Sequence, residues 1–383
     1  MSLKSSSLPG KKQELLSKSQ QSSKPPRLLA LDALRGLTIL LMLLVNNIVL
    51  DTATPRQLMH APWNGGIRVA DLVFPWFLFC VGVAIPFSYA AFIKKGIPSW
   101  RYDLKVIQRT VLLVMLGCLI DSSIVKHPIF TLDVLQLIGL AYMIGTMLYV
   151  LPLFRRILIA GVFLLFYWFA IKFIPVPGVG IGIFEETRNL IYHINRTYLD
   201  AVHLAGLPSV IPTGALVLIA TAIGDLLKKS DAKHLWKLKW LFIIGIILVA
   251  GGMIWNQSLG YNKAVWTPSY ILFTAGLATI VLSFFYLIID FKGWSLWAYP
   301  LIVFGSNAIF AYVTPILFKI WILQRCHISV GDGKTVTVQQ WFLAFFTAYI
   351  GRVNSGWLYT IIYILFWWLI LWILYKKKWF IRV

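Results

Sequence analysis

The stretch that decides the fold is Asp71-Leu-Val-Phe-Pro-Trp-Phe-Leu-Phe-Cys-Val-Gly-Val-Ala-Ile-Pro-Phe-Ser-Tyr-Ala-Ala-Phe-Ile93, which carries no charged residue after Asp71. A helix rises about 1.5 Å per residue, so a run of this length covers the roughly 30 Å of a bilayer's hydrocarbon core. Similar apolar runs recur from Leu31 to the C-terminus. A soluble protein needs polar residues on every outer face. We therefore interpret the chain as an all-α integral membrane protein.

The composition of the whole chain supports the same class. Of its 383 residues, 59% are hydrophobic and 13% are charged, about half the charged content of a typical soluble domain. The formal net charge of +21 lies mainly in short connectors, where basic residues set orientation and meet lipid headgroups. No RNA-binding motif accompanies these charges, so we do not expect nucleic-acid binding. The spacing of Cys80, Cys118 and Cys326 predicts neither a disulfide framework nor a zinc site.

The apolar runs predict a bundle of about ten transmembrane helices. The polar segment 1–26 lacks apolar periodicity and is expected to be a disordered cytoplasmic tail, followed by a single transmembrane domain over 27–383. The apolar segment 339–350 is too short to cross and is expected to be an interfacial helix. We place the spans near 28–50, 69–93, 105–124, 132–152, 156–175, 208–228, 238–257, 267–290, 296–317 and 356–376.

The distribution of basic residues predicts that both termini are cytoplasmic. With ten spans, most of the lysines and arginines fall on the side of the N-terminus, as the positive-inside rule requires. An eleventh span at 339–350 would move Lys376, Lys377 and Lys378 to the other side, against that rule. We expect a multi-pass protein of the cell inner (plasma) membrane, in contact with membrane lipids.

Polar residues inside spans are costly and often mark functional sites. In the first span, Asp32, Arg35, Met42 and Asn46 share one helical face. Arg35 and Asn46 are separated by about 16 Å at the helical rise, a length that could border the extended arm of coenzyme A. The alternative is an Asp32–Arg35 ion pair at the interface, with Asn46 bonded to a neighbouring helix.

A second set of polar residues comes from His60-Ala-Pro-Trp-Asn-Gly65 and from Asp71 at the start of the second span. An imidazole can take a proton from an attacking amine or hydroxyl, and Asp71 is near enough in sequence to orient it. Asn46 and Asn64 could donate hydrogen bonds to a developing oxyanion. The alternative for His60 is a structural hydrogen bond, and spacing alone does not decide between the two.

Other patterns carry less information. No HxxH or HxxxH pair, glycine-rich phosphate loop or GxSxG motif is present, so we predict no protein-held metal, no ATP hydrolysis and no serine-hydrolase site. Ser306 and Asn307 form a polar patch with Tyr312, either as a pocket wall or as interhelical hydrogen bonds. The polar connector 175–208 is either part of a binding mouth or a solvated loop.

The motifs above resemble those of the heparan-alpha-glucosaminide N-acetyltransferase family. The resemblance is carried by Arg27-Leu-Leu-Ala-Leu-Asp-Ala-Leu-Arg-Gly36, Val45-Asn46, His60-Ala-Pro-Trp-Asn-Gly65 and Asp71-Leu-Val-Phe-Pro-Trp-Phe77. It is dense over residues 27–90 and continues more weakly through Trp266-Thr-Pro-Ser-Tyr270 and Gly305-Ser-Asn-Ala308.

The resemblance implies an enzyme that takes acetyl-CoA from the cytoplasm and acetylates a glucosamine-type amino sugar on the periplasmic or lumenal side. His60 matches the active-site histidine, Asn46 its companion and Asp71 the motif carboxylate. Whether the histidine acts as a base or carries the acetyl group stays open, and we favour the base. The remaining expected contacts are Trp63, Asn64, Ser306 and Asn307 for the saccharide acceptor and Asp32, Arg35, Lys105 and Arg109 for acetyl-CoA.

The chain departs from the family pattern where Leu137 replaces a frequent arginine and where Gly206-Leu-Pro-Ser-Val-Ile-Pro212 lacks an Asp-Pro-Glu-Gly motif. The acceptor therefore stays open between an amino sugar and a sugar hydroxyl. Two alternatives remain: a polysaccharide O-acyltransferase, and a non-enzymatic transporter of sugars or lipid-linked intermediates. The sequence also leaves open whether the chain forms a homodimer.

Overall fold

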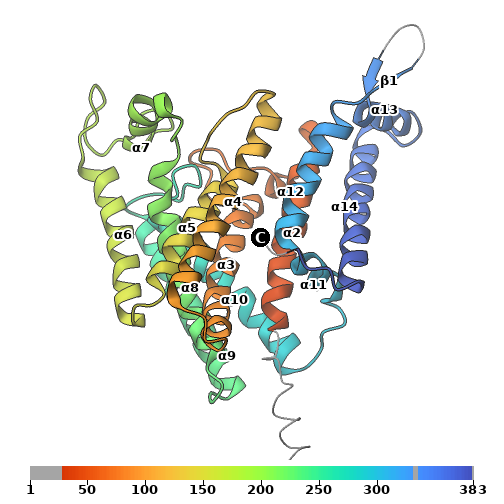
Figure 1. Cartoon of the computed structure of the whole chain (residues 1–383). Coiled ribbons are helices and arrows are strands. Elements are labelled where there is room, and N and C mark those ends of the chain that lie inside the picture. Colours follow the sequence, from red (N-terminus) through yellow and green to blue (C-terminus); the bar gives the residue numbers. More distant parts are fainter. Residues whose placement is uncertain (1–27, 331–334, 382–383) are drawn as a thin grey trace, which may run out of the picture.

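The computed structural model describes residues 28–330 and 335–381, and the predicted disordered tail lies outside these ranges. The described chain is a bundle of long helices with one two-stranded hairpin (Figure 1). The helices are α2 (Leu29–Asn47), α3 (Val69–Ile93), α4 (Ser99–Val125), α5 (Val134–Leu148), α6 (Leu153–Phe173), α7 (Leu190–Ile194), α8 (Val210–Lys228), α9 (His234–Asn256), α10 (Pro268–Phe285), α11 (Tyr299–Ser306), α12 (Ala308–Phe318), α13 (Val338–Ile350) and α14 (Arg352–Lys376).

The strands β1 (His327–Ser329) and β2 (Thr335–Thr337) pair antiparallel, with Ile328 opposite Val336. Short π-helical segments continue α10 over Tyr286–Phe291 and α12 over Lys319–Leu323. The hairpin, α7 and α13 lie at the same end of the bundle, at the top of Figure 1. The all-α class predicted from the sequence is confirmed.

Every one of the ten predicted spans contains a helix. Among the described residues, seven helices are long and apolar enough to cross a membrane, and an eighth is added if α11 and α12 count as one bent span. The other two segments are α4, whose first half carries Arg101, Asp103, Lys105 and Arg109, and α5, which has only 15 residues. The α4 helix starts at Ser99, earlier than predicted, because apolarity alone does not detect its charged first turns.

Burial separates central from peripheral helices. The apolar stretches of α3 and α8 are 78% and 72% buried inside the protein, whereas those of α9 and α14 are 17% and 28% buried. Large apolar side chains lie exposed on the peripheral helices, such as Leu165 on α6, Ile247 on α9 and Leu365 on α14. Outward-facing apolar surface of this extent is suited to lipid rather than to water.

Glycines allow α2 and α11 to touch backbone to backbone. A Cβ atom added at Gly36 would lie 1.7 Å from the Leu301 carbonyl oxygen, and one at Gly305 would lie 2.0 Å from the Asp32 carbonyl oxygen. Small residues at such crossings permit the close packing that holds membrane helices together. This crossing fixes the position of α2, which carries several of the predicted functional residues.

The predicted span 296–317 is not one straight helix. Its parts α11 and α12 are bent by 79°, and the break falls at Asn307. The Asn307 amide nitrogen donates to the Trp379 carbonyl oxygen at 3.1 Å, and its oxygen accepts from the Ile381 N–H at 2.8 Å. The side chain therefore ties the segment after α14 to the break, and polar backbone groups freed there find partners within the protein.

Candidate active site

The segment between α2 and α3 brings His60 to the start of α3. Asp71 lies in the first turn of α3, where the helix N-terminus favours a carboxylate. One oxygen, Oδ2, accepts from the backbone N–H groups of Ala61 and Arg68, each at 3.1 Å. The other, Oδ1, is 2.9 Å from His60 Nδ1. The Asp71 side chain is 3% exposed and that of His60 55% exposed, so a buried carboxylate orients an accessible imidazole.

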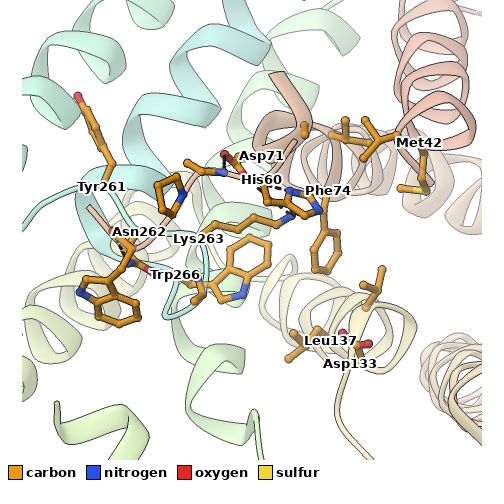
Figure 2. A pocket seen from close by; sticks show the side chains of 18 of the residues that line it. Met42, His60, Asp71, Phe74, Asp133, Leu137, Tyr261, Asn262, Lys263 and Trp266 are labelled. Carbon is orange, nitrogen blue, oxygen red and sulfur yellow. Dashed lines mark hydrogen bonds and ion pairs between the residues drawn. The ribbon is translucent and has the colours of Figure 1, made fainter. Parts of the chain in front are cut away.

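Lys263, from the loop between α9 and α10, lies beside this pair (Figure 2). Its Nζ atom is 3.0 Å from His60 Nδ1, 3.4 Å from His60 Nε2 and 3.8 Å from Asp71 Oδ1. Burial lowers the pKa of Lys263 below its usual value, while the charges of Asp71 and Asp133 oppose this shift. The site therefore contains three titratable groups in mutual contact.

Three distant segments are hydrogen-bonded together around His60. The Asn262 amide donates to the Trp63 carbonyl oxygen at 3.0 Å, and the Trp63 indole N–H donates to the Phe184 carbonyl oxygen at 3.1 Å. The Trp63 and Phe184 rings lie 5.0 Å apart. Asn262 is 4% exposed, and its amide oxygen also accepts from the N–H of Ala264 at 2.8 Å. These bonds fix the loop that carries Lys263 against the segment that carries His60.

His60 lines a cavity of about 630 Å³, hereafter the His60 cavity. Four predicted site residues line it: Asn46, His60, Trp63 and Asp71. Figure 2 shows further lining side chains from other elements around the imidazole, among them Asp133, Lys263 and Trp266. Glu186, from the connector 175–208, also lines it. That connector therefore contributes to the mouth of the cavity at this position.

A smaller cavity of about 350 Å³ adjoins the first, hereafter the Asp121 cavity. It shares Asn46, Asp133 and Tyr312 with the His60 cavity. Its further polar lining consists of Asn47, Asp121, Gln136, Lys319 and Gln324. The Gln136 amide donates to Asp121 Oδ2 at 2.8 Å. Asn46 on α2 and Tyr312 on α12 therefore lie in the wall between the two cavities.

A third cavity, of about 870 Å³, is lined by the cations Arg35, Lys95, Lys105 and Arg109 and is hereafter the Arg109 cavity. The Arg109 guanidinium lies 4.5 Å over the Tyr142 ring, and Lys105 Nζ lies 5.8 Å over the Phe92 ring. Arg109 Nε is buried and has no hydrogen-bond partner within the described part of the protein. A buried donor in that position is suited to an anionic ligand. Leu135 lines both this cavity and the Asp121 cavity.

The other predicted residues lie elsewhere. Ser306 lines the Arg109 cavity rather than the His60 cavity, and Asn64 is exposed in a turn. Asn307 is 1% exposed and bonded to the segment after α14. Asp32 is buried and lies 3.6 Å from Arg35. Of these four, only Ser306 lines one of the three cavities.

The sequence reasoning missed Lys263, Asn262 and Asp133. Lys263 lies three positions before Trp266, at which the family resemblance resumes. That neighbouring motif was the signal that could have found it. Among the described residues, no group of three or more His, Cys, Asp and Glu side chains is arranged to hold a metal ion.

Comparison with known proteins agrees with the motifs. The family described as a domain of unknown function, DUF5009, matches residues 27–124. Human heparan-alpha-glucosaminide N-acetyltransferase is 28% identical over 78% of this chain and 54% of its own length. The resemblance is confirmed. The mouse enzyme of the same name is 26% identical over 75% of this chain and 53% of its own length. The chain thus spans about half the length of the curated relatives it matches.

Proposed function

We propose that the protein is a transmembrane acetyltransferase that moves acetyl from acetyl-CoA to an amino sugar. The observation that carries the proposal is the His60–Asp71 pair, held at 2.9 Å in the wall of a cavity. The similarity to heparan-alpha-glucosaminide N-acetyltransferases supports the same reaction class. The Arg109 cavity supplies a separate place for an anionic co-substrate.

His60 acts as the general base in this proposal. With Nδ1–H donated to Asp71 Oδ1, Nε2 carries the lone pair, a tautomer that follows from the hydrogen bond. The acceptor amine attacks the thioester carbonyl carbon, so the C–N bond forms while Nε2 takes a proton from nitrogen. The tetrahedral intermediate then breaks its C–S bond, and the proton passes from Nε2 to the departing thiolate. The Asn46 amide lines the same cavity and stabilises the oxyanion.

The Arg109 cavity binds the phosphates of acetyl-CoA. Arg35, Lys105 and Arg109 provide positive charge there, and the buried Arg109 Nε provides a donor. Arg35 lies at that cavity and Asn46 at the His60 cavity, and both belong to α2. The pantetheine arm follows α2 between these residues, over about 16 Å at the helical rise.

The His60 cavity binds the acceptor. Asp133 and Glu186 place carboxylates on its wall, which attract the ammonium form of an amino sugar. The ammonium then loses one proton to water and becomes the amine that attacks the thioester. Trp63 and Trp266 offer flat apolar faces for the sugar ring. In this proposal the protein lies in the plasma membrane with both termini in the cytoplasm. The His60 cavity then opens on the periplasmic or lumenal side, and the Arg109 cavity opens on the cytoplasmic side.

The test uses the purified full chain in detergent with radiolabelled acetyl-CoA and a panel of amino and neutral sugars. The native protein transfers label to an amino sugar, and His60→Ala lowers the rate by about 10²- to 10⁴-fold. His127→Ala, a change in an exposed loop, is the matched control and keeps the native rate.

Three results would contradict the proposal. Label recovered only on sugar hydroxyls would identify an O-acyltransferase. Sugar uptake into liposomes without acetylation would identify a transporter. Equal rates in the native protein and the His60→Ala variant would remove the imidazole from the reaction.

A further inference from the structure

The contacts of His60 Nδ1 exceed what this atom can satisfy by hydrogen bonding. Asp71 Oδ1 lies 2.9 Å from it and Lys263 Nζ lies 3.0 Å from it. A ring nitrogen holds either one hydrogen or one lone pair. The bond to Asp71 uses the hydrogen, so Nδ1 has no lone pair left to accept from the lysine. The 3.0 Å contact between Lys263 Nζ and Nδ1 is therefore a contact of charge rather than a second hydrogen bond at that atom.

The charges around His60 come from several elements. Asp71 on α3 and Lys263 in the α9–α10 loop touch the ring, and the Arg68 guanidinium donates to the His60 carbonyl oxygen at 3.1 Å. Asp133 and Glu186 line the same cavity. Among the described residues, Lys263 is the cation whose side chain contacts the imidazole nitrogens. Its effect on a proton at Nε2 is therefore the strongest repulsive one.

We propose that Lys263 is a positioning residue that makes His60 release the proton it has accepted. This inference rests on the proposed acetyl transfer. The ammonium of Lys263 repels the imidazolium that forms when Nε2 takes the proton of the amine. The repulsion promotes donation of that proton to the CoA thiolate as the C–S bond breaks. The cycle ends with neutral His60, the free thiol of CoA and the N-acetylated sugar, so protons and bonds balance.

The structure holds Lys263 in position for this role. Asn262 is bonded to the Trp63 carbonyl oxygen and to the backbone of its own loop, and Trp266 adopts a left-handed φ of 53° that turns the chain into α10. The lysine side chain is 29% exposed, so water only partly screens its charge. Asp71, 3.8 Å away, attracts the ammonium and keeps it beside the ring.

A chemical-modification experiment tests the charge effect without relying on acetyl transfer. Diethyl pyrocarbonate reacts with neutral imidazole, and His60 is accessible because its side chain is 55% exposed. Modification of His60 in the full chain is followed by mass spectrometry as a function of pH. Lys263→Met removes the charge, Lys263→Arg keeps it, and Lys126→Met removes an exposed lysine outside the His60 cavity.

We expect Lys263→Met to raise the pH midpoint of His60 modification by about one unit, the usual size of a neighbouring-charge effect. Lys263→Arg and Lys126→Met keep the native midpoint. The acidic limb of the kcat/KM profile for acetyl transfer shifts in the same direction in Lys263→Met, with kcat reduced about tenfold. If Lys263→Met does not fold, Lys263→Gln removes the same charge and replaces it in both measurements.

An unchanged midpoint after loss of the lysine charge overturns the inference, because a purely structural role for Lys263 does not change proton affinity at His60. That result is distinct from failure of the proposed function. If neither the native protein nor any variant transfers acetyl, the pH midpoint of His60 modification still reports whether the charge of Lys263 acts on His60. If the native protein transfers acetyl and the midpoint is unchanged, only the role of Lys263 is wrong.

Discussion

The His60 cavity and the Arg109 cavity both contain charged side chains, but they hold them differently. In the first, Asp71 is fixed by two backbone N–H groups and His60 is fixed by Asp71, at distances of 2.9 to 3.1 Å. In the second, the Arg109 guanidinium lies on the Tyr142 ring and keeps a buried Nε for which the described residues supply no acceptor. The first arrangement fixes the imidazole in one orientation, which a proton-transfer reaction requires. The second keeps a donor available, which anion binding requires.

The largest effect is expected from Asp71→Asn, which tests the fixed geometry of the first cavity. The amide can present its nitrogen to His60 Nδ1, which favours the wrong tautomer and removes the lone pair from Nε2. We expect kcat for acetyl transfer to fall on the order of 10³-fold, with acetyl-CoA affinity unchanged. Steady-state kinetics and equilibrium binding measure the two quantities. A comparable loss of acetyl-CoA affinity would show that the two cavities do not work separately.

An intermediate effect is expected from Arg109→Gln, which tests the second cavity. Loss of charge-assisted hydrogen bonds to phosphate weakens acetyl-CoA binding by about 10- to 100-fold, while kcat changes little. The matched control is Arg101→Gln on the same helix, because Arg101 is exposed and lies outside the Arg109 cavity. If both variants bind acetyl-CoA with the affinity of the native protein, the phosphates of acetyl-CoA bind outside the Arg109 cavity.

The smallest effect on acetyl transfer is expected from Gly36→Ala, which changes the stability of the helix crossing next to the Arg109 cavity. The new methyl group meets the Leu301 carbonyl oxygen at the α2–α11 crossing and costs about 1–3 kcal/mol of unfolding free energy. Gly161→Ala in α6 is the control, since an added Cβ there has nothing within 4 Å. Thermal melting in detergent compares the two. Alanine favours a helix more than glycine does, so the control keeps or raises the native melting temperature. A melting temperature as low for the control as for Gly36→Ala would show that the loss does not come from the α2–α11 contact.

Most of the fold could be predicted from the sequence, because long apolar runs indicate which segments lie in the hydrocarbon core of the membrane. The sequence also predicted the His60–Asp71 pair, since both residues are close in the chain and Asp71 lies in the first turn of a helix. It did not predict the 79° break at Asn307, where neither Pro nor Gly stands at the break itself. Lys263 was missed because it lies 203 positions after His60, and a lone loop lysine has no periodic signal.

That separation along the chain has a consequence for how the protein is made. Ribosomes add about 5–20 residues per second, so His60 and Asp71 emerge from the ribosome about 10–40 s before the Lys263 that contacts them, given the 203 positions between His60 and Lys263. During that interval α3 enters the bilayer without the loop that later covers its acidic first turn. The imidazole therefore acquires its complete surroundings only after most of the chain has been synthesised and α10 has docked.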